Sequence, residues 1–227
     1  MHFLIIGGTG RNGSLALQEA LARGHTVTAL VRNTASTKLP THSNLTLVQG
    51  TPTSQSDISK ALATPRTPQV IITALAQVRV TESPFAALHP DTTPDFMAVS
   101  MRALLTAITQ ANLPFNPKII VNSAQGAGTS WRSMNLPGKV LFSHGSMGTG
   151  LKDHNEVDRL VRESGLSFVL ARPVMLAEGE ARLVKVWPDD GKGCAWMPKI
   201  TRKSVGKWLV DAAESIEWDG QSPVLSN

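Results

Sequence analysis

The stretch Gly7-Gly8-Thr9-Gly10-Arg11-Asn12-Gly13 decides the fold, because it joins an apolar run to an amphipathic one near the start of the chain. Residues 2–6, HFLII, predict a buried strand, and residues 12–22 predict a helix. Glycines at positions 7, 10 and 13 allow a tight turn and a close approach to a pyrophosphate, which the helix N-terminus attracts. We interpret the stretch as a dinucleotide site, with an ordinary tight turn as the alternative.

Short apolar runs alternate with longer amphipathic stretches along the rest of the chain. Apolar strands that alternate with helices indicate a parallel sheet covered on both faces, and right-handed crossovers make it doubly wound. The predicted fold is therefore α/β, a doubly wound parallel (Rossmann) sheet in a single domain of residues 1–227. Further strands are expected at 26–31, 45–49, 70–75, 118–123, 167–171 and 223–226, and further helices at about 55–63, 94–111, 151–164 and 203–215.

Three less regular segments, residues 77–93, 124–150 and 174–200, follow the fourth, fifth and sixth predicted strands. They lie at the carboxyl ends of the strands, the edge where doubly wound sheets bind ligands. Residues 77–93 are long for such a connection, which is typical of a lid or binding loop. We expect the three segments to form a pocket for a small apolar substrate. Trp131, Trp187 and Trp196 fall within them and either line that pocket or anchor the packing.

The composition excludes several classes of protein. With 41% hydrophobic and 17% charged residues, the 227-residue chain is neither disordered nor a coiled coil. No apolar run is long enough for a membrane span, and a strand that begins at His2 leaves no room for a signal peptide, so we expect a cytoplasmic protein without membrane contact. A lone cysteine, Cys194, excludes an internal disulfide, and the six scattered histidines show no metal-ligand spacing, so we expect no metal.

The net charge of +5 permits an anionic partner but does not identify one. The chain has no basic run interleaved with aromatic residues, so we expect no nucleic acid and assign the charge to cofactor phosphates and solvated side chains. The sequence carries no signal for an oligomeric state.

The end of the second predicted strand bears on cofactor specificity. An acidic residue about 20 positions after the glycine loop would bind the ribose 2′-hydroxyl of NAD. This chain has Arg32 there, whose guanidinium could bind a 2′-phosphate bidentately, with Arg11 and Lys38 nearby in sequence. The alternative is a solvated arginine. The pattern favours NADP(H) over NAD(H).

Three stretches together resemble a known family: GGTGRNG at 7–13, LVRN at 30–33 and KDHNEVDRLVRESGLSFVLARPVML at 152–176. They are similar to the NmrA-like, atypical short-chain dehydrogenase/reductase group and to the related biliverdin and flavin reductases. The resemblance implies a nicotinamide-binding Rossmann fold and spans nearly the whole chain. Members include NADPH-dependent reductases, isomerases and redox sensors, and many fungal relatives act in secondary metabolism. The loop, the strand ends and the resemblance together predict cofactor contacts at Gly7, Thr9, Gly10, Arg11, Asn12, Gly13, Arg32, Leu75, Ser123, Lys152 and Pro173.

The chain departs from the family pattern at two places. The wider superfamily pairs a tyrosine with a lysine four residues later, but the position four before Lys152 is Gly148, and the chain contains no tyrosine. Any mechanism that needs a phenol as proton donor is therefore excluded. The family usually has Gly-Asp after the third strand, whereas Gly50 here is followed by Thr51.

Three residues are the predicted catalytic candidates. The resemblance places Ser123 at the substrate-orienting serine, and a backbone cap is the alternative. It matches Lys152 to the lysine that holds the nicotinamide ribose, whereas a helical ion pair with Glu156 is the alternative. His154 either supplies or organises a proton, or is a surface histidine. His144 is a second candidate donor.

These residues favour an NADPH-dependent reductase that acts on a small conjugated or polycyclic molecule. Such an electrophile accepts a hydride without a strong protein acid, because delocalisation spreads the charge and water can supply the proton later. Two alternatives remain open: a redox-neutral isomerase or cyclase that uses bound NADP(H), and a non-catalytic NADP(H)-sensing regulatory protein.

Overall fold

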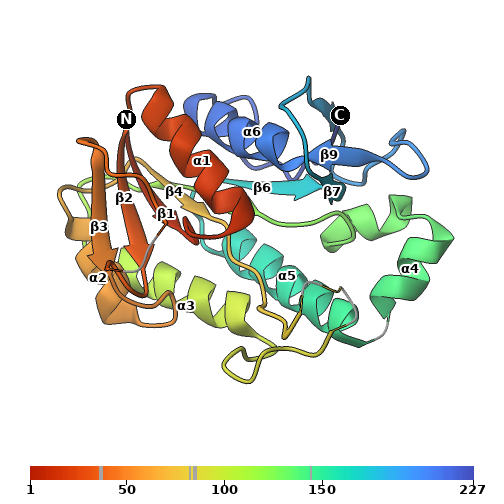
Figure 1. Ribbon diagram of the computed structural model, residues 1–227, viewed down its shortest axis with the longest axis horizontal. Coiled ribbons are helices and arrows are strands. Elements are labelled where there is room, and N and C mark those ends of the chain that lie inside the picture. Colours follow the sequence, from red (N-terminus) through yellow and green to blue (C-terminus); the bar gives the residue numbers. More distant parts are fainter. Residues whose placement is uncertain (36–37, 82, 84–85, 144) are drawn as a thin grey trace.

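An eight-stranded sheet forms the centre of the molecule, in the order β3-β2-β1-β4-β5-β6-β10-β8 (Figure 1). The structure is a computed structural model that describes residues 1–35, 38–81, 83, 86–143 and 145–227. The paired strands are parallel except β8, which runs antiparallel to β10 at one edge. The predicted doubly wound sheet is thus confirmed. The strands are β1 (His2–Ile6), β2 (Thr26–Val31), β3 (Leu45–Gln49), β4 (Val70–Thr73), β5 (Lys118–Asn122), β6 (Phe168–Pro173), β8 (Lys185–Trp187) and β10 (Val224–Ser226).

Helices cover both faces of the sheet (Figure 1). Helices α1 (Arg11–Ala22) and α6 (Arg202–Glu214) lie on one face, and α2 (Gln55–Ala63), α3 (Phe96–Gln110) and α5 (Gly145–Glu163) lie on the other. Successive strand residues point to opposite faces, so each strand supplies two cores. Phe3 and Ile5 join the core under α1 and α6, whereas Leu4 and Ile6 join the core under the other three helices.

The segment 124–150 differs from its prediction as an irregular loop. It contains a short 3-10 helix, η1 (Gly128–Ser133), the helix α4 (Leu136–Ser143) and the start of α5, which begins at Gly145 rather than near Leu151. Glycine is a poor helix former, so residues 145–150, GSMGTG, give no helical signal in the sequence. Packing of α5 against α3 and α4 overrides that local preference.

The segment 174–200 also contains structure that the sequence did not predict. Strand β7 (Met175–Ala177) pairs in parallel with β9 (Lys199–Thr201) in a small second sheet, and β8 joins the edge of the main sheet. Each of these strands has three residues, too few for an alternating pattern to show.

The order of the strands fixes where a ligand binds. The chain passes from β1 to β2 and β3 on one side and then returns to place β4 on the other side of β1. The carboxyl ends of β1 and β4 therefore flank the point where the strand order reverses, which is the ligand-binding crevice of such sheets. The parallel register aligns Ile6 with Thr73, and Thr73 with Val121, so these strands end at the same edge.

Candidate functional site

The glycine loop lies at this crevice, and its backbone packs too closely for side chains. Gly7 has φ +89°, and a Cβ there would lie 2.5 Å from the carbonyl oxygen of Ala74, which follows β4. A Cβ on Gly13 would lie 2.2 Å from the Gly7 oxygen. The Gly10 N–H donates to the Gly7 oxygen at 3.0 Å and closes the turn. The loop thus needs glycine for its own geometry, and it leaves a backbone cradle at the switch point.

The N-terminus of α1 opens directly from this loop and is free to receive an anion. Its first flanking residue, Gly10, has no side chain to cap the helix, and the first turn contains no acidic residue. The unpaired N–H groups and the helix dipole therefore favour a phosphate. Thr9 and Arg11 beside them are exposed. These features fit the pyrophosphate of a dinucleotide.

The residues that follow β2 carry positive charge, whereas a carboxylate lies beside the end of β3. Arg32 and Lys38 are exposed after the strand, and the residues that directly follow β2 include no carboxylate. On the neighbouring strand end, the backbone N–H of Thr51 donates to the Asp57 carboxylate at 2.9 Å. Asp57, from α2, thus lies beside Gly50, close to the place where the family usually carries its aspartate.

Sequence reasoning missed Arg202, the first residue of α6. Its Nη1 donates to Asn12 Oδ1 at 2.9 Å, and its Nε donates to Glu178 at 2.8 Å. Asn12 in turn reaches Asn122, at the end of β5, with a long 3.5 Å contact. The Arg202 side chain is 15% exposed, so a mostly buried cation supports the glycine loop from the opposite end of the chain.

A large cavity of about 580 Å³ opens from the carboxyl ends of β5 and β6. Ser123 and Pro173 line it where β5 and β6 end, and the rest of its wall comes from residues 124–142, Met147 of α5, residues 174–176 and residues 195–198. A volume between about 300 and 1,000 Å³ is typical of sites for drug-sized ligands. Of the three tryptophans named above, Trp196 lines this cavity, whereas Trp187 packs against the core and donates its Nε1–H to Ser226 at 2.9 Å.

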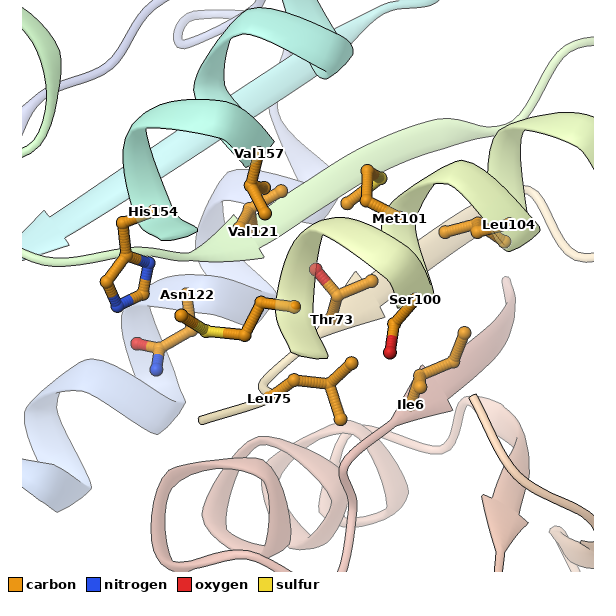
Figure 2. Close-up of a pocket in the computed structure, with 11 residues that line it drawn as sticks. Ile6, Thr73, Leu75, Ser100, Met101, Leu104, Val121, Asn122, His154 and Val157 are labelled. Carbon is orange, nitrogen blue, oxygen red and sulfur yellow. The ribbon is translucent and has the colours of Figure 1, made fainter. Parts of the chain in front are cut away.

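A second, small cavity of about 20 Å³ lies between β4, β5, α3 and α5 (Figure 2). Leu75, Asn122 and His154 line it together with Thr73, Ser100 and apolar side chains. Its volume is close to that of one water molecule, so it is too small for a substrate. Figure 2 shows the His154 ring next to the Asn122 amide. Leu75 also lies beside the glycine loop, because its Cδ2 would be 3.3 Å from a Cβ on Gly7.

The predicted catalytic residues do not share one cavity. Ser123 is buried at the large cavity, His154 borders the small one, and Lys152 is exposed on α5. Lys152 makes no ion pair with Glu156, which instead binds Arg102 at 2.6 Å and Arg159 at 2.8 Å. The roles given to these three residues remain predictions. His144, the second candidate donor, lies outside the described residues.

Burial sets the protonation state of His154. Desolvation lowers its pKa to about 4, and its Nδ1 is buried without a hydrogen-bond partner among the described residues. The imidazole is therefore neutral near pH 7. It can hydrogen-bond to a neighbouring group, but it cannot act as a cationic proton donor.

Asp153, next to His154, is tied to the start of α3. Its carboxylate accepts the N–H groups of Met97 at 2.9 Å and Ala98 at 2.8 Å, where the flanking Asp95 provides no side-chain cap. Gln77 donates to the same carboxylate at 3.2 Å. The segment 77–93 is thus joined at its beginning to α3 and α5. Its role as a lid remains a prediction.

The strand order and the glycine loop at the switch point define a nucleotide-binding Rossmann domain. Residues 7–215 match the model of a family described as NAD(P)H-binding, and the chain belongs to this family. Its cofactor is therefore NAD(P)(H). No curated protein matches the sequence.

Solved structures with the same fold include three reductase-like proteins. The ChuY anaerobilin reductase of Escherichia coli is 17% identical with a TM-score of 0.74, and the alignment covers 100% of this chain and 97% of ChuY. A Veillonella parvula short-chain dehydrogenase/reductase in complex with NADP is 15% identical, with a TM-score of 0.75 and coverage of 100% and 94%. The Lactococcus lactis oxidoreductase ylbE is 16% identical, with a TM-score of 0.75 and coverage of 100% and 91%. These likenesses confirm the predicted Rossmann fold.

None of the described helices is long and apolar enough to cross a membrane. Across the same described residues, no group of three or more His, Cys, Asp and Glu side chains is arranged to hold a metal ion.

Proposed function

We propose that this protein is a cytoplasmic, NADPH-dependent reductase of the atypical short-chain type, which acts on a small conjugated or polycyclic molecule of secondary metabolism. One observation carries the proposal. The 580 Å³ cavity begins at Ser123 and Pro173, on the same sheet edge as the glycine loop, so a ligand in it would lie beside a cofactor bound at that loop.

The residues of the chain contribute mainly by position. When bound, the reduced cofactor supplies a hydride, and one proton from water completes the reduction of a carbonyl. The Ser123 hydroxyl has no hydrogen-bond partner among the described residues, so it is available to a substrate oxygen. The apolar wall excludes water and holds the substrate in place, and such positioning accounts for much of the rate in many enzymes. Lys152 remains a candidate for holding the ribose.

The preference for NADPH rests on Arg32. Calorimetric titration with both reduced cofactors should show tighter binding of NADPH, and Arg32→Asp should reduce that preference by about 10- to 100-fold, since it removes charged hydrogen bonds. Equal or tighter binding of NADH that the substitution does not change would contradict the assignment.

Turnover decides between the reductase and its alternatives. We would follow loss of the reduced-nicotinamide absorbance with a panel of quinones, flavins and conjugated imines. Ser123→Ala should slow turnover and leave part of it, because a single donor contributes about 10²–10⁴-fold. Rearrangement of a substrate without net cofactor oxidation would select a redox-neutral isomerase. Tight NADPH binding without turnover of any compound would favour a sensor.

A further inference from the structure

No charged side chain lines the large cavity within the part of the chain that the structure describes. Four of the lining residues are methionines, and the others are apolar, small or neutral polar. Methionine side chains are flexible and polarisable, so they adapt to flat ring systems of different outline. The wall is therefore suited to a large apolar surface, and it offers no counter-ion to a charged one.

The buried arginine next to this wall does not supply a charge either. Arg172, which precedes Pro173, has no exposed surface, and its Nη2 donates to Asp158 at 2.6 Å. Its Nη1 donates to the Thr129 hydroxyl at 3.0 Å and to the Asp189 carbonyl at 2.8 Å. The guanidinium is thus held in a paired network with Asp158, whose carboxylate also binds Arg162 at 2.7 Å, and it does not line the cavity.

Among the serine, asparagine and glutamine side chains of the cavity wall, those without a partner lie together after β5. Asn135 binds the Gly138 N–H at 2.8 Å and the Trp196 carbonyl, and the Ser133 hydroxyl donates to Ser130 at 3.0 Å. The side chains of Ser123 and Gln125 have no such partner among the described residues. Both follow β5, so the polar end of the cavity is the end nearest the sheet edge.

We infer that the site selects an uncharged, carbonyl-bearing polycycle and rejects the same ring system when it carries a carboxylate, phosphate or sulfonate. This inference rests on the proposed function, whose substrate class it narrows. The carbonyl lies toward Ser123 and Gln125, and the rings lie among the methionines. An anionic group on the rings would lose its hydration without gaining a cation, a penalty that supports a discrimination on the order of 100-fold.

A size-matched pair of ligands tests the inference: 2-methylanthraquinone, which is neutral, and anthraquinone-2-sulfonate, which is anionic. Equilibrium dialysis against the protein without added cofactor measures binding without turnover and without the positive charge of an oxidised nicotinamide. The neutral quinone should bind about 100-fold more tightly than the sulfonate.

A charge variant tests the cause of that difference. Met175 lines the cavity and is 48% exposed, so Met175→Arg adds a cation at the cavity without burying it deeply. This substitution should reduce the ratio of the two dissociation constants at least about tenfold, because the new arginine can form an ion pair with the sulfonate. Leu183→Arg is the matched control, because Leu183 is 86% exposed and is not part of the cavity wall. It should leave that ratio unchanged.

The outcomes separate this inference from the proposed function. Equal binding of the two quinones, tighter binding of the sulfonate, or no binding of either would overturn the inference. The inference would also be overturned if Leu183→Arg reduced the affinity ratio of the two quinones as much as Met175→Arg does. Net charge alone would then explain the effect. Selective binding without oxidation of NADPH by any quinone, flavin or conjugated imine would instead refute the reductase and leave the selectivity of the cavity intact.

Discussion

Removal of the Asp158 carboxylate should destabilise the fold strongly, because it leaves the buried Arg172 guanidinium without its ionic partner. The Arg172 side chain is 0% exposed and the Asp158 side chain 11% exposed, and their Nη2 and Oδ2 atoms lie 2.6 Å apart. A buried ion pair broken on one side typically costs about 3–5 kcal/mol. This is a large share of a total stability of about 5–15 kcal/mol.

The magnitude translates into a clear shift in a denaturation experiment. With a urea dependence of about 1–3 kcal/mol per molar, Asp158→Ala should lower the unfolding midpoint by about 1–5 M, read by circular dichroism. Glu156→Gln, on the same helix, is the matched control. Glu156 pairs with Arg102 and Arg159 at the surface, so its loss should barely move the midpoint.

A double variant separates the unpaired charge from the lost contacts. If the cost comes from the stranded guanidinium, Asp158→Ala combined with Arg172→Met should be no less stable than Asp158→Ala alone, because the second change removes the charge. Additive losses from the two substitutions would refute this reasoning. So would a midpoint shift for Asp158→Ala no larger than that of the Glu156→Gln control.

Three further perturbations test the cofactor loop and the partly buried His154. Gly13→Ala would place a Cβ 2.2 Å from a backbone oxygen of the loop, so calorimetry should show NADPH binding weakened about 100-fold or more. Gly150→Ala is the control, because the atom nearest to its new Cβ would lie 3.4 Å away, and this variant should bind NADPH normally. Arg202→Leu removes the guanidinium that orients Asn12 and should weaken NADPH binding about tenfold in the same titration; an unchanged affinity would exclude that role. The pKa of His154 is about 4 in the fold against an ordinary 6.5, so the unfolded chain takes up a proton first as the pH falls. Stability should therefore decrease between about pH 6.5 and 4 by up to about 3 kcal/mol, and urea titrations across this range should show a flatter dependence for His154→Leu.

The sequence predicts the strands and helices of the main sheet layers well, because their local patterns agree with the final packing. The strands β2 and β3 and the helix α2 begin and end where the apolar periodicity places them. The helix α4 and the strands around residues 174–200 escape prediction for a physical reason. They are short, and they are held by contacts with distant segments rather than by their own propensity.

The site shows the same division between local and distant information. The glycine loop is contiguous, so spacing alone identifies it. Arg202 reaches Asn12 from 190 positions further along the chain, and nothing in its immediate sequence marks that contact. Burial of His154 depends on how α5 meets α3 and β5, so the sequence predicts the imidazole but not its protonation state.

The chain contains no phenol, and the described lining of the large cavity contains no cationic side chain, which bears on the kind of substrate that this site can reduce. The chain has no tyrosine, His154 is neutral near pH 7, and the large cavity has no charged side chain among the described residues. A localised alkoxide that formed there would have little beyond the Ser123 and Gln125 side chains to stabilise it. In a quinone or an extended conjugated ketone, the same charge spreads over the rings, and the polarisable methionine wall tolerates it better. The lack of a tyrosine, which excludes the tyrosine–lysine pair of the wider superfamily, thus favours a substrate with a delocalised charge. The lining of the cavity indicates the same kind of uncharged, conjugated molecule.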